Sequence, residues 1–219
     1  DRRRGNARRG ATRPAEQGEL IVGRLVDHGP APYQHQPAQP MSYYVRIETE
    51  HGDREIWGVD LERAVRQSLS TPGVGAEVGL RAVRRDAVTV IAPRLDPSGR
   101  ELGRDELGVH RNKWILETRE FLDRRLVMAD TFRNAAVSPA DAVNRYPELA
   151  GSYLQLQMAR AGAEQRVSSV EAREQFVEHL RAHLAKTIEY GQPLEPVHLK
   201  GRTEPDLDRS RSRDIAPER

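Results

Sequence analysis

The side chains best suited to chemistry lie between residues 28 and 57. Aromatic, histidine and arginine residues are concentrated there: Tyr33, Tyr43, Tyr44, Trp57, His28, His35, Arg46 and Arg54. An exposed aromatic ring stacks on a nucleic-acid base with about 1–3 kcal/mol per base, and arginine contacts the phosphates. Neighbouring residues of a strand point to opposite faces, so one of Tyr43 and Tyr44 should lie in a core. Two interpretations stay open: a stacking surface, or rings that fill a barrel and its seam with the helical half.

A second polar cluster is His110-Arg111-Asn112-Lys113-Trp114, which puts two cations beside a ring at an expected strand-to-helix junction. The first turn of a helix together with Arg111 and Lys113 would receive a phosphate group. The alternative is a helix cap, with Trp114 anchored between two halves of the molecule.

The other polar motifs do not indicate catalysis. His179 and His183 have the i, i+4 spacing that lets two imidazoles share a metal, but no third ligand is near in sequence. The chain has no cysteine, which excludes thiolate catalysis and cysteine-based zinc sites. Ser138, Ser168 and Ser169 are expected to cap helices. We therefore expect no cofactor and no bound metal, and we do not expect an enzyme.

The first half of the chain has the pattern of strands. We expect a strand at 18–29, a long loop, a hairpin over 41–59 and a helix over 60–69 with Asp60 as its N-cap. A second hairpin is expected over 76–93 with its turn at Arg85-Asp86, and a small third one over 94–102 with the turn Asp96-Pro97-Ser98-Gly99.

The second half has helical periodicity. Helices are expected over 110–128, over 138–165 with a new start at Pro147, and over 168–190 with a stop at Gly191. The order strand, hairpin, helix, hairpin is the connectivity of an OB-type barrel. The predicted fold class is α+β: a small OB-like β-barrel, closed and plugged by the helix at 60–69, followed by a helical bundle. Gly23, Gly58 and Gly79 are expected at strand bends.

Composition sets the limits of this prediction. The chain has 219 residues, 31% of them charged, and a net charge of only +2, so the distribution of charge matters more than its sum. No apolar run reaches the roughly 20 residues of a membrane span, and we expect a soluble intracellular piece of a longer protein. The expected domains are a basic disordered arm or linker at 1–17, the barrel at 18–109, a helical domain at 110–192 and a charged flexible tail at 193–219.

Four short motifs carry a family resemblance: DHGPAPY at 27–33, SYYV at 42–45, WGVDLERA at 57–64 and HRNKW at 110–114. With them, residues 18–115 resemble the accessory domain in the C-terminal region of conjugative relaxases (mobilisation proteins) and plasmid primases. The helical half, with YPELAGSYLQL at 146–156, loosely resembles the bundles that serve as translocation signals in type IV secretion.

In such relaxases the active site consists of a tyrosine nucleophile and three metal-binding histidines, and the sequence offers no such cluster. The resemblance therefore implies a non-catalytic module of a bacterial conjugation protein. It implies single-stranded transfer DNA and the relaxosome or the type IV secretion coupling protein as partners. It places the protein in the bacterial cytoplasm, with translocation into recipient cells as a further expectation. The expected nucleic-acid contacts are Tyr33, Tyr43, Arg46, Arg54, Trp57, Arg111 and Lys113, with phosphate attraction from the arginines of 2–13.

Two other functions stay open. One is a protein-interaction scaffold that recruits a secretion receptor and has no nucleic-acid contact. The other is an uncharacterised hydrolase, which no motif supports.

Overall fold

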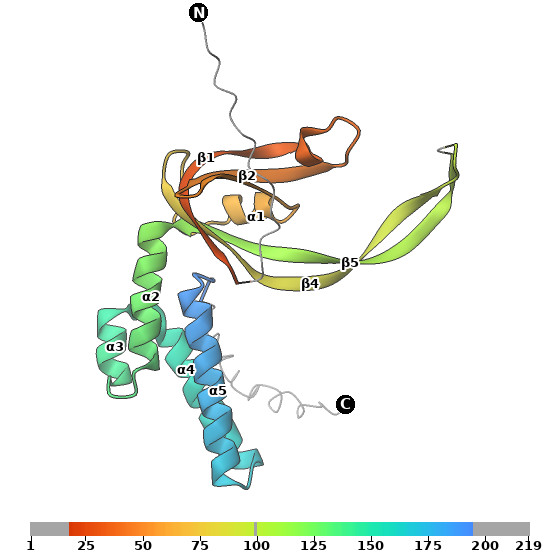
Figure 1. Cartoon of the computed structure of the whole chain (residues 1–219). Helices are drawn as coiled ribbons and strands as arrows, with labels where there is room; N and C mark the ends of the chain where they lie inside the picture. Colours follow the sequence, from red (N-terminus) through yellow and green to blue (C-terminus); the bar gives the residue numbers. More distant parts are fainter. Residues whose placement is uncertain (1–17, 99, 195–219) are drawn as a thin grey trace, which may run out of the picture.

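The computed structural model describes residues 18–98 and 100–194, and it is of the α+β class. A curled half-barrel of five antiparallel strands is followed by a group of helices (Figure 1). The arm expected at 1–17 and nearly all of the tail expected at 193–219 lie outside the described residues.

The sheet contains strands in the order β3-β2-β1-β4-β5. Their bounds are β1 Leu20–Pro32, β2 Met41–Thr49, β3 Gly52–Trp57, β4 Glu77–Leu95 and β5 Glu101–Thr118. The expected succession of strand, long loop, β2–β3 hairpin and helix over 18–69 is confirmed, but the second and third expected hairpins are replaced by one long hairpin of β4 and β5. The expected closed barrel is wrong: within the described part of the chain, β3 and β5 are unpaired edges of an open sheet.

Alternation along the strands builds the core on one face of this sheet. In β2, Tyr43, Val45 and Ile47 are buried while the residues between them are at least partly exposed. Leu80 of β4 and Leu116 of β5 are fully buried against the same cluster.

Helix α1 (Leu61–Arg66) fills the open side of the half-barrel, with Leu61 and Ala64 in the core. At its start, Asp60 accepts a hydrogen bond from the backbone N–H of Trp114 at 2.8 Å. One turn later, Arg63 donates to the carbonyl of the same residue at 2.7 Å. These two side chains satisfy both backbone hydrogen-bonding groups of Trp114 at the edge of β5.

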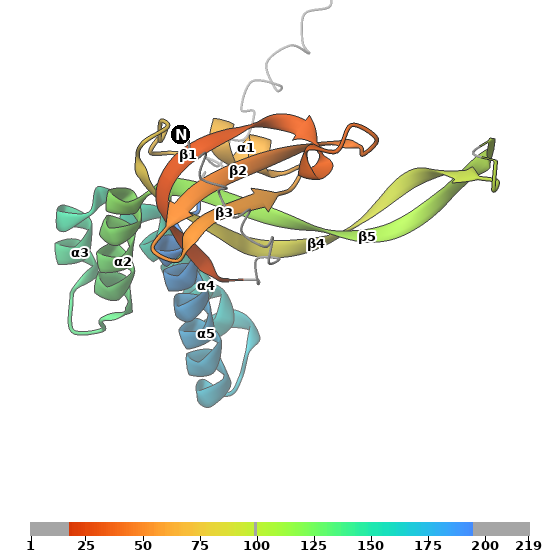
Figure 2. The same cartoon turned by 45° about the horizontal axis from the view of Figure 1, so that its top comes forward.

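Strands β4 and β5 form one long hairpin, which corrects the expected turn at Arg85-Asp86. Both residues lie within β4, opposite Asn112 and Arg111. The chain turns instead between Asp96 and Arg100, whose backbone groups are joined at 2.9 Å. Because β1 pairs with β4 only over Glu77–Arg81, the rest of the hairpin projects as a two-stranded arm (Figures 1 and 2). An arm with solvent on both faces has no apolar alternation, so its charged residues resemble a turn in the sequence.

The helix expected from residue 110 begins only at Arg119. Residues 110–118 belong to β5, and the expected domain boundary between 109 and 110 falls inside that strand. Trp114, whose spacing from Phe121 and Leu122 favours one helix face in the sequence, is buried in the sheet core. Thr118 is the true N-cap, because its side chain accepts from the N–H of Phe121 at 3.3 Å.

The helical half consists of α2 (Arg119–Arg133), α3 (Pro139–Arg145), α4 (Ala150–Arg166) and α5 (Val170–Glu189). The N-caps expected at Ser138 and Ser169 are confirmed, and Gly191 has a left-handed φ of 72° after α5. A second core joins α2, α4, α5 and the short helical turn η2 (Pro147–Leu149) through Met128, Phe132, Leu149, Tyr153 and Ile188. In the part of the chain that the structure describes, no helix is both long and apolar enough to cross a membrane.

Candidate nucleic-acid interface

Four rings gather on the outer face of the sheet, the face opposite the core. Tyr44 of β2 lies directly across from Trp57 of β3, with ring centres 5.3 Å apart. The short helical turn η1 (Tyr33–His35) in the β1–β2 loop adds the other two rings. His35 lies 5.0 Å from Tyr44 and 4.9 Å from Trp57, and Tyr33 lies 5.6 Å from Trp57. We call these four residues the ring cluster.

The β1–β2 loop reaches the ring cluster through an unfavourable backbone. Gln34 and His35 both have positive φ, 54° and 57°. For residues other than glycine this conformation costs roughly 1–2 kcal/mol each. The loop is held by a hydrogen bond from the N–H of Tyr33 to the carbonyl of Pro40 at 3.0 Å. Such strain is typical of a loop whose position serves binding.

Charged groups surround the ring cluster in near balance. The Tyr44 hydroxyl donates to Asp27 at 2.8 Å, and Arg46 lies 3.7 Å from the same carboxylate. The Tyr44 hydrogen bond lowers the pKa of Asp27 and raises the pKa of Tyr44 itself. Glu55 accepts from the Trp57 indole at 3.0 Å and lies 3.3 Å from His35. These bonds fix the rings in place while leaving Tyr33 42% exposed.

Tyr43 is a core residue, which corrects its place among the expected nucleic-acid contacts. It is only 8% exposed, and its hydroxyl lies 2.8 Å from Nδ1 of His28. The signal was present in the sequence: Tyr43 shares its parity in the strand with Val45 and Ile47, so it had to face inward. Tyr44 and His35 are the ring residues that were left out of the expected contacts.

The two arginines expected among the contacts on β2 and β3 lie on opposite faces of the sheet. Arg46 lies on the outer face beside the ring cluster, two residues after Tyr44 in β2, and its buried Nε has no hydrogen-bond partner among the described residues. Arg54 has the parity of the buried Ile56, so it lies on the other face of β3. There it pairs with Glu19 at 2.6 Å.

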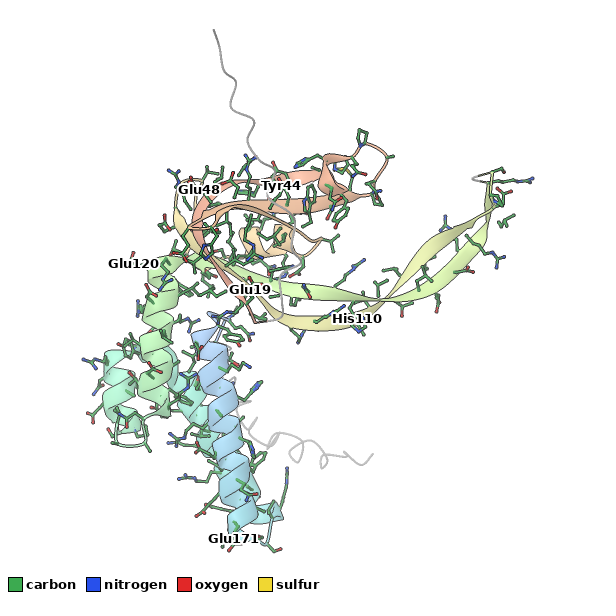
Figure 3. The ribbon with its side chains drawn as sticks, viewed as in Figure 1. Glu19, Tyr44, Glu48, His110, Glu120 and Glu171 are labelled. Carbon is green, nitrogen blue, oxygen red and sulfur yellow. The ribbon has the colours of Figure 1, made fainter. Side chains whose placement is uncertain are left out.

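Arg111 and Lys113 lie on β5, away from the ring cluster. Lys113 is held by Asp60 at 3.0 Å. Arg111 is exposed on the hairpin arm opposite Asp86. Figure 3 places Tyr44 on the upper part of the sheet and His110, the neighbour of Arg111, along the arm. Of the seven expected contacts, the structure therefore brings together Tyr33, Arg46 and Trp57.

The buried polar groups outside this face stabilise the fold. Glu117 is 3% exposed and accepts four hydrogen bonds, from the backbone N–H groups of Leu69 and Ser70 and from the hydroxyls of Ser68 and Ser70. These bonds hold the turn that follows α1. Among residues 18–98 and 100–194, no three histidine or carboxylate side chains gather as metal ligands.

Comparison with known proteins adds no assignment. No family model, no curated protein and no solved structure matches the chain.

Proposed function

We propose that the protein is a single-stranded nucleic-acid-binding module that uses the ring cluster as its base-stacking surface. The observation that carries this proposal is the cluster's position. Tyr33, His35, Tyr44 and Trp57 lie together on the outer face of β2 and β3, beside the β1–β2 loop.

An OB-like assignment supports the choice of this face. In OB barrels the face of strands 2 and 3 binds oligonucleotides, flanked by the loop between strands 1 and 2 and by that between strands 4 and 5. Here the ring cluster occupies that face, η1 belongs to the first of these loops, and the β4–β5 arm corresponds to the second. We propose that the half-barrel is an OB variant whose edge is sealed by α1.

Base stacking rather than phosphate attraction would dominate affinity at this face. Arg46 is offset by Asp27, and Glu55 adds a further carboxylate, so the surface near the rings carries no excess positive charge. Stacking tolerates any sequence because every base presents a π-face. The module would therefore bind single strands with little sequence preference.

The biological setting follows from the resemblance of residues 18–115 to accessory domains of conjugative relaxases and plasmid primases. We propose a non-catalytic role in bacterial conjugation: holding the transfer strand, and contacting the relaxosome or the type IV secretion coupling protein. The helical half would serve that second contact. This setting also implies function in the bacterial cytoplasm, with passage into recipient cells.

A protein-interaction scaffold without nucleic-acid contact is the second candidate. The observation that favours it is the exposure of large apolar side chains on the helices: Val127 at 51%, Met158 at 51% and Phe176 at 49%. A scaffold would keep its partner when the ring cluster is removed, and it would bind no oligonucleotide.

The two candidates are separated by titrating a labelled oligothymidylate of about ten nucleotides, near the site size of one OB fold. We expect Tyr33→Ala combined with Trp57→Ala to weaken binding about tenfold or more, since two stacking surfaces are lost. The control is Phe176→Ala, which removes an exposed ring from α5. Equal affinities for the control and the double variant would contradict the proposal.

A further inference from the structure

A cleft of about 640 Å³ lies between the base of the β4–β5 hairpin and the C-terminal part of α5. The sheet side contributes Val83, Arg84, Lys113, Trp114 and Ile115, and α1 contributes Arg63. The helical side contributes His183, Lys186, Thr187 and Tyr190, followed by Gln192 and Pro193. We call this space the basic cleft.

The lining is strongly cationic. Its cationic side chains are Arg63, Arg84, Lys113 and Lys186, and among the described residues no aspartate or glutamate lines the cleft. Two carboxylates that are not part of the lining form ion pairs with three of these cations. Asp60 bonds Arg63 and Lys113, and Asp86 bonds Arg84. Four cations against two carboxylates leave the cleft with an excess positive charge of about two.

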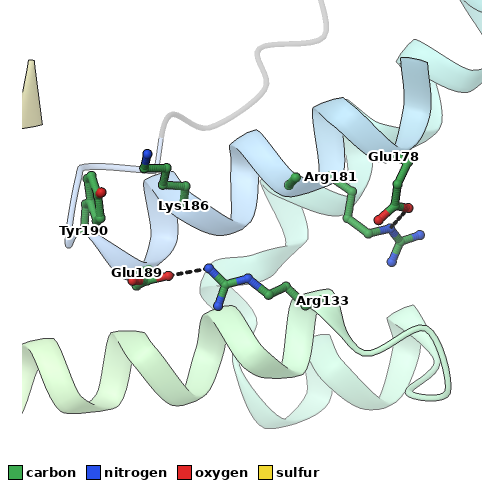
Figure 4. A pocket seen from close by; sticks show the side chains of 7 residues that line it. Arg133, Glu178, Arg181, Lys186, Glu189 and Tyr190 are labelled. Atoms are coloured by element: carbon green, nitrogen blue, oxygen red, sulfur yellow. Dashed lines mark hydrogen bonds and ion pairs between the residues drawn. The ribbon is translucent and has the colours of Figure 1, made fainter. Parts of the chain in front are cut away.

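Lys186 supplies the least compensated of these charges. Among the described residues it forms no ion pair, and its ammonium lies 5.3 Å from the centre of the Tyr190 ring. In the neighbouring pocket, Glu189 is engaged by Arg133, while the Lys186 side chain lies toward Tyr190 (Figure 4). The carboxylate nearest to it in sequence therefore has a different partner.

The residues on the helical side of the cleft lie on one face of α5 and its C-terminal end. His183, Lys186, Thr187 and Tyr190 follow the i, i+3, i+4, i+7 spacing that places side chains on one face of a helix. Tyr190 is anchored from the other side by the guanidinium of Arg81, 4.2 Å above its ring. The wall facing the sheet is thus fixed, with ammonium, imidazole and hydroxyl groups side by side.

We propose that the basic cleft binds phosphate groups. Its four cations are the donors that phosphate oxygens accept from. Its volume lies in the usual range for small-ligand sites. The site is separate from the ring cluster and does not depend on it. Its ligand is the phosphate itself, whether in a nucleic-acid backbone or in a small phosphorylated molecule.

The experiment measures binding of inorganic pyrophosphate to the full chain by calorimetry. A second reporter is the fluorescence of Trp114, which becomes the sole tryptophan in the Trp57→Phe variant because the chain has two. The test variant is Arg84→Glu with Lys186→Glu, which reverses two lining charges. The matched control is Arg160→Glu with Arg166→Glu on α4, which makes the same change in net charge on exposed residues elsewhere.

We expect saturable pyrophosphate binding with a change in Trp114 fluorescence. The test variant should lose affinity about tenfold or more, and the control should keep it. An abasic phosphodiester oligomer serves as the second ligand. If it competes with pyrophosphate, the site takes a nucleic-acid backbone; if it does not, the site takes small phosphorylated molecules. Both results support the phosphate site.

Absence of pyrophosphate binding, or equal loss in the control, would overturn the inference. Because pyrophosphate carries no base, either result leaves the stacking proposal for the ring cluster untouched.

Discussion

The carboxylate of Asp60 accepts the backbone N–H of Trp114 at 2.8 Å and thereby joins the start of α1 to the edge of β5. The same carboxylate receives Arg63 at 2.7 Å and Lys113 at 3.0 Å. One side chain therefore satisfies a backbone donor at a strand edge and contacts two cations. No strand pairing closes the half-barrel; instead, the side chains of α1 pack into its open side.

Replacing this carboxylate should destabilise the fold. Asp60→Asn removes the charge that two cations and a backbone donor share, so we expect unfolding free energy to fall by roughly 2–3 kcal/mol. Urea denaturation at pH 7 measures it. Asp123→Asn, which breaks an exposed pair with Arg119 in α2, is the control and should change stability by less than about 0.5 kcal/mol.

The effect of Asp60 should also depend on pH. Partial burial raises its pKa, but the hydrogen bonds from Arg63, the Trp114 N–H and Lys113 outweigh burial and hold the pKa below its ordinary value. Because the folded-state pKa is lowered, the stabilisation is complete above about pH 4 and is lost as pH falls further. The difference in unfolding free energy between wild type and Asp60→Asn should therefore become smaller as the pH falls below about 4. A difference that grows below pH 4 would contradict this assignment.

Glu117 should be among the most sensitive positions in the chain. Its carboxylate receives four hydrogen bonds from the turn at 68–70 and is 3% exposed, so Glu117→Ala leaves buried donors without an acceptor. We expect a loss of roughly 3 kcal/mol or more in urea denaturation. Glu106→Ala, on the exposed arm, should be nearly neutral, and equal losses would show that Glu117 is not special.

Gly23 allows β1 and β2 to approach closely. A Cβ built there would lie 2.2 Å from the carbonyl oxygen of Glu48, a contact with backbone that cannot rotate away. Gly23→Ala should destabilise by about 2 kcal/mol or more, because the strands must separate. Gly108→Ala on the arm meets no atom within 4 Å and should have little effect in the same thermal melt. A tolerated Gly23→Ala would mean that the strands pack less closely.

Tyr43 separates stability from binding. Tyr43→Phe keeps the buried ring but loses the hydroxyl contact with His28, which should cost about 1 kcal/mol of stability. Oligothymidylate affinity should stay unchanged, since the residue faces the core. If Tyr43→Phe lost more binding free energy for oligothymidylate than unfolding free energy, Tyr43 would belong to the binding surface.

The sequence predicted the elements that local chemistry determines. The β2–β3 hairpin, the helix after Asp60, the turn at Asp96 and the caps Ser138 and Ser169 all follow from residue type and period. The prediction failed where the exposure of a strand does not match the period of its apolar residues. The arm around Arg85 is exposed on both faces and shows no alternation. Trp114 is a buried sheet residue, but its spacing from Phe121 and Leu122 is that of one helix face.

The candidate site was predicted in part for a similar reason. Tyr33, Arg46 and Trp57 were identified from their type and proximity, and parity along β2 could have exchanged Tyr43 for Tyr44. His35 could not be placed, because its contacts depend on a loop with two left-handed residues that no propensity predicts. The basic cleft joins residues more than 100 positions apart, such as Arg63 and Lys186, and only tertiary packing reveals it.

The base-stacking claim is tested most directly by comparing two ligands of equal length and charge. Fluorescence anisotropy would measure the affinity of the chain for an oligothymidylate and for its abasic phosphodiester counterpart. Since each stacked base contributes about 1–3 kcal/mol, we expect the base-bearing strand to bind about tenfold tighter or more, and Trp57→Ala to remove most of this advantage. Equal affinity of the wild-type chain for both ligands would contradict it.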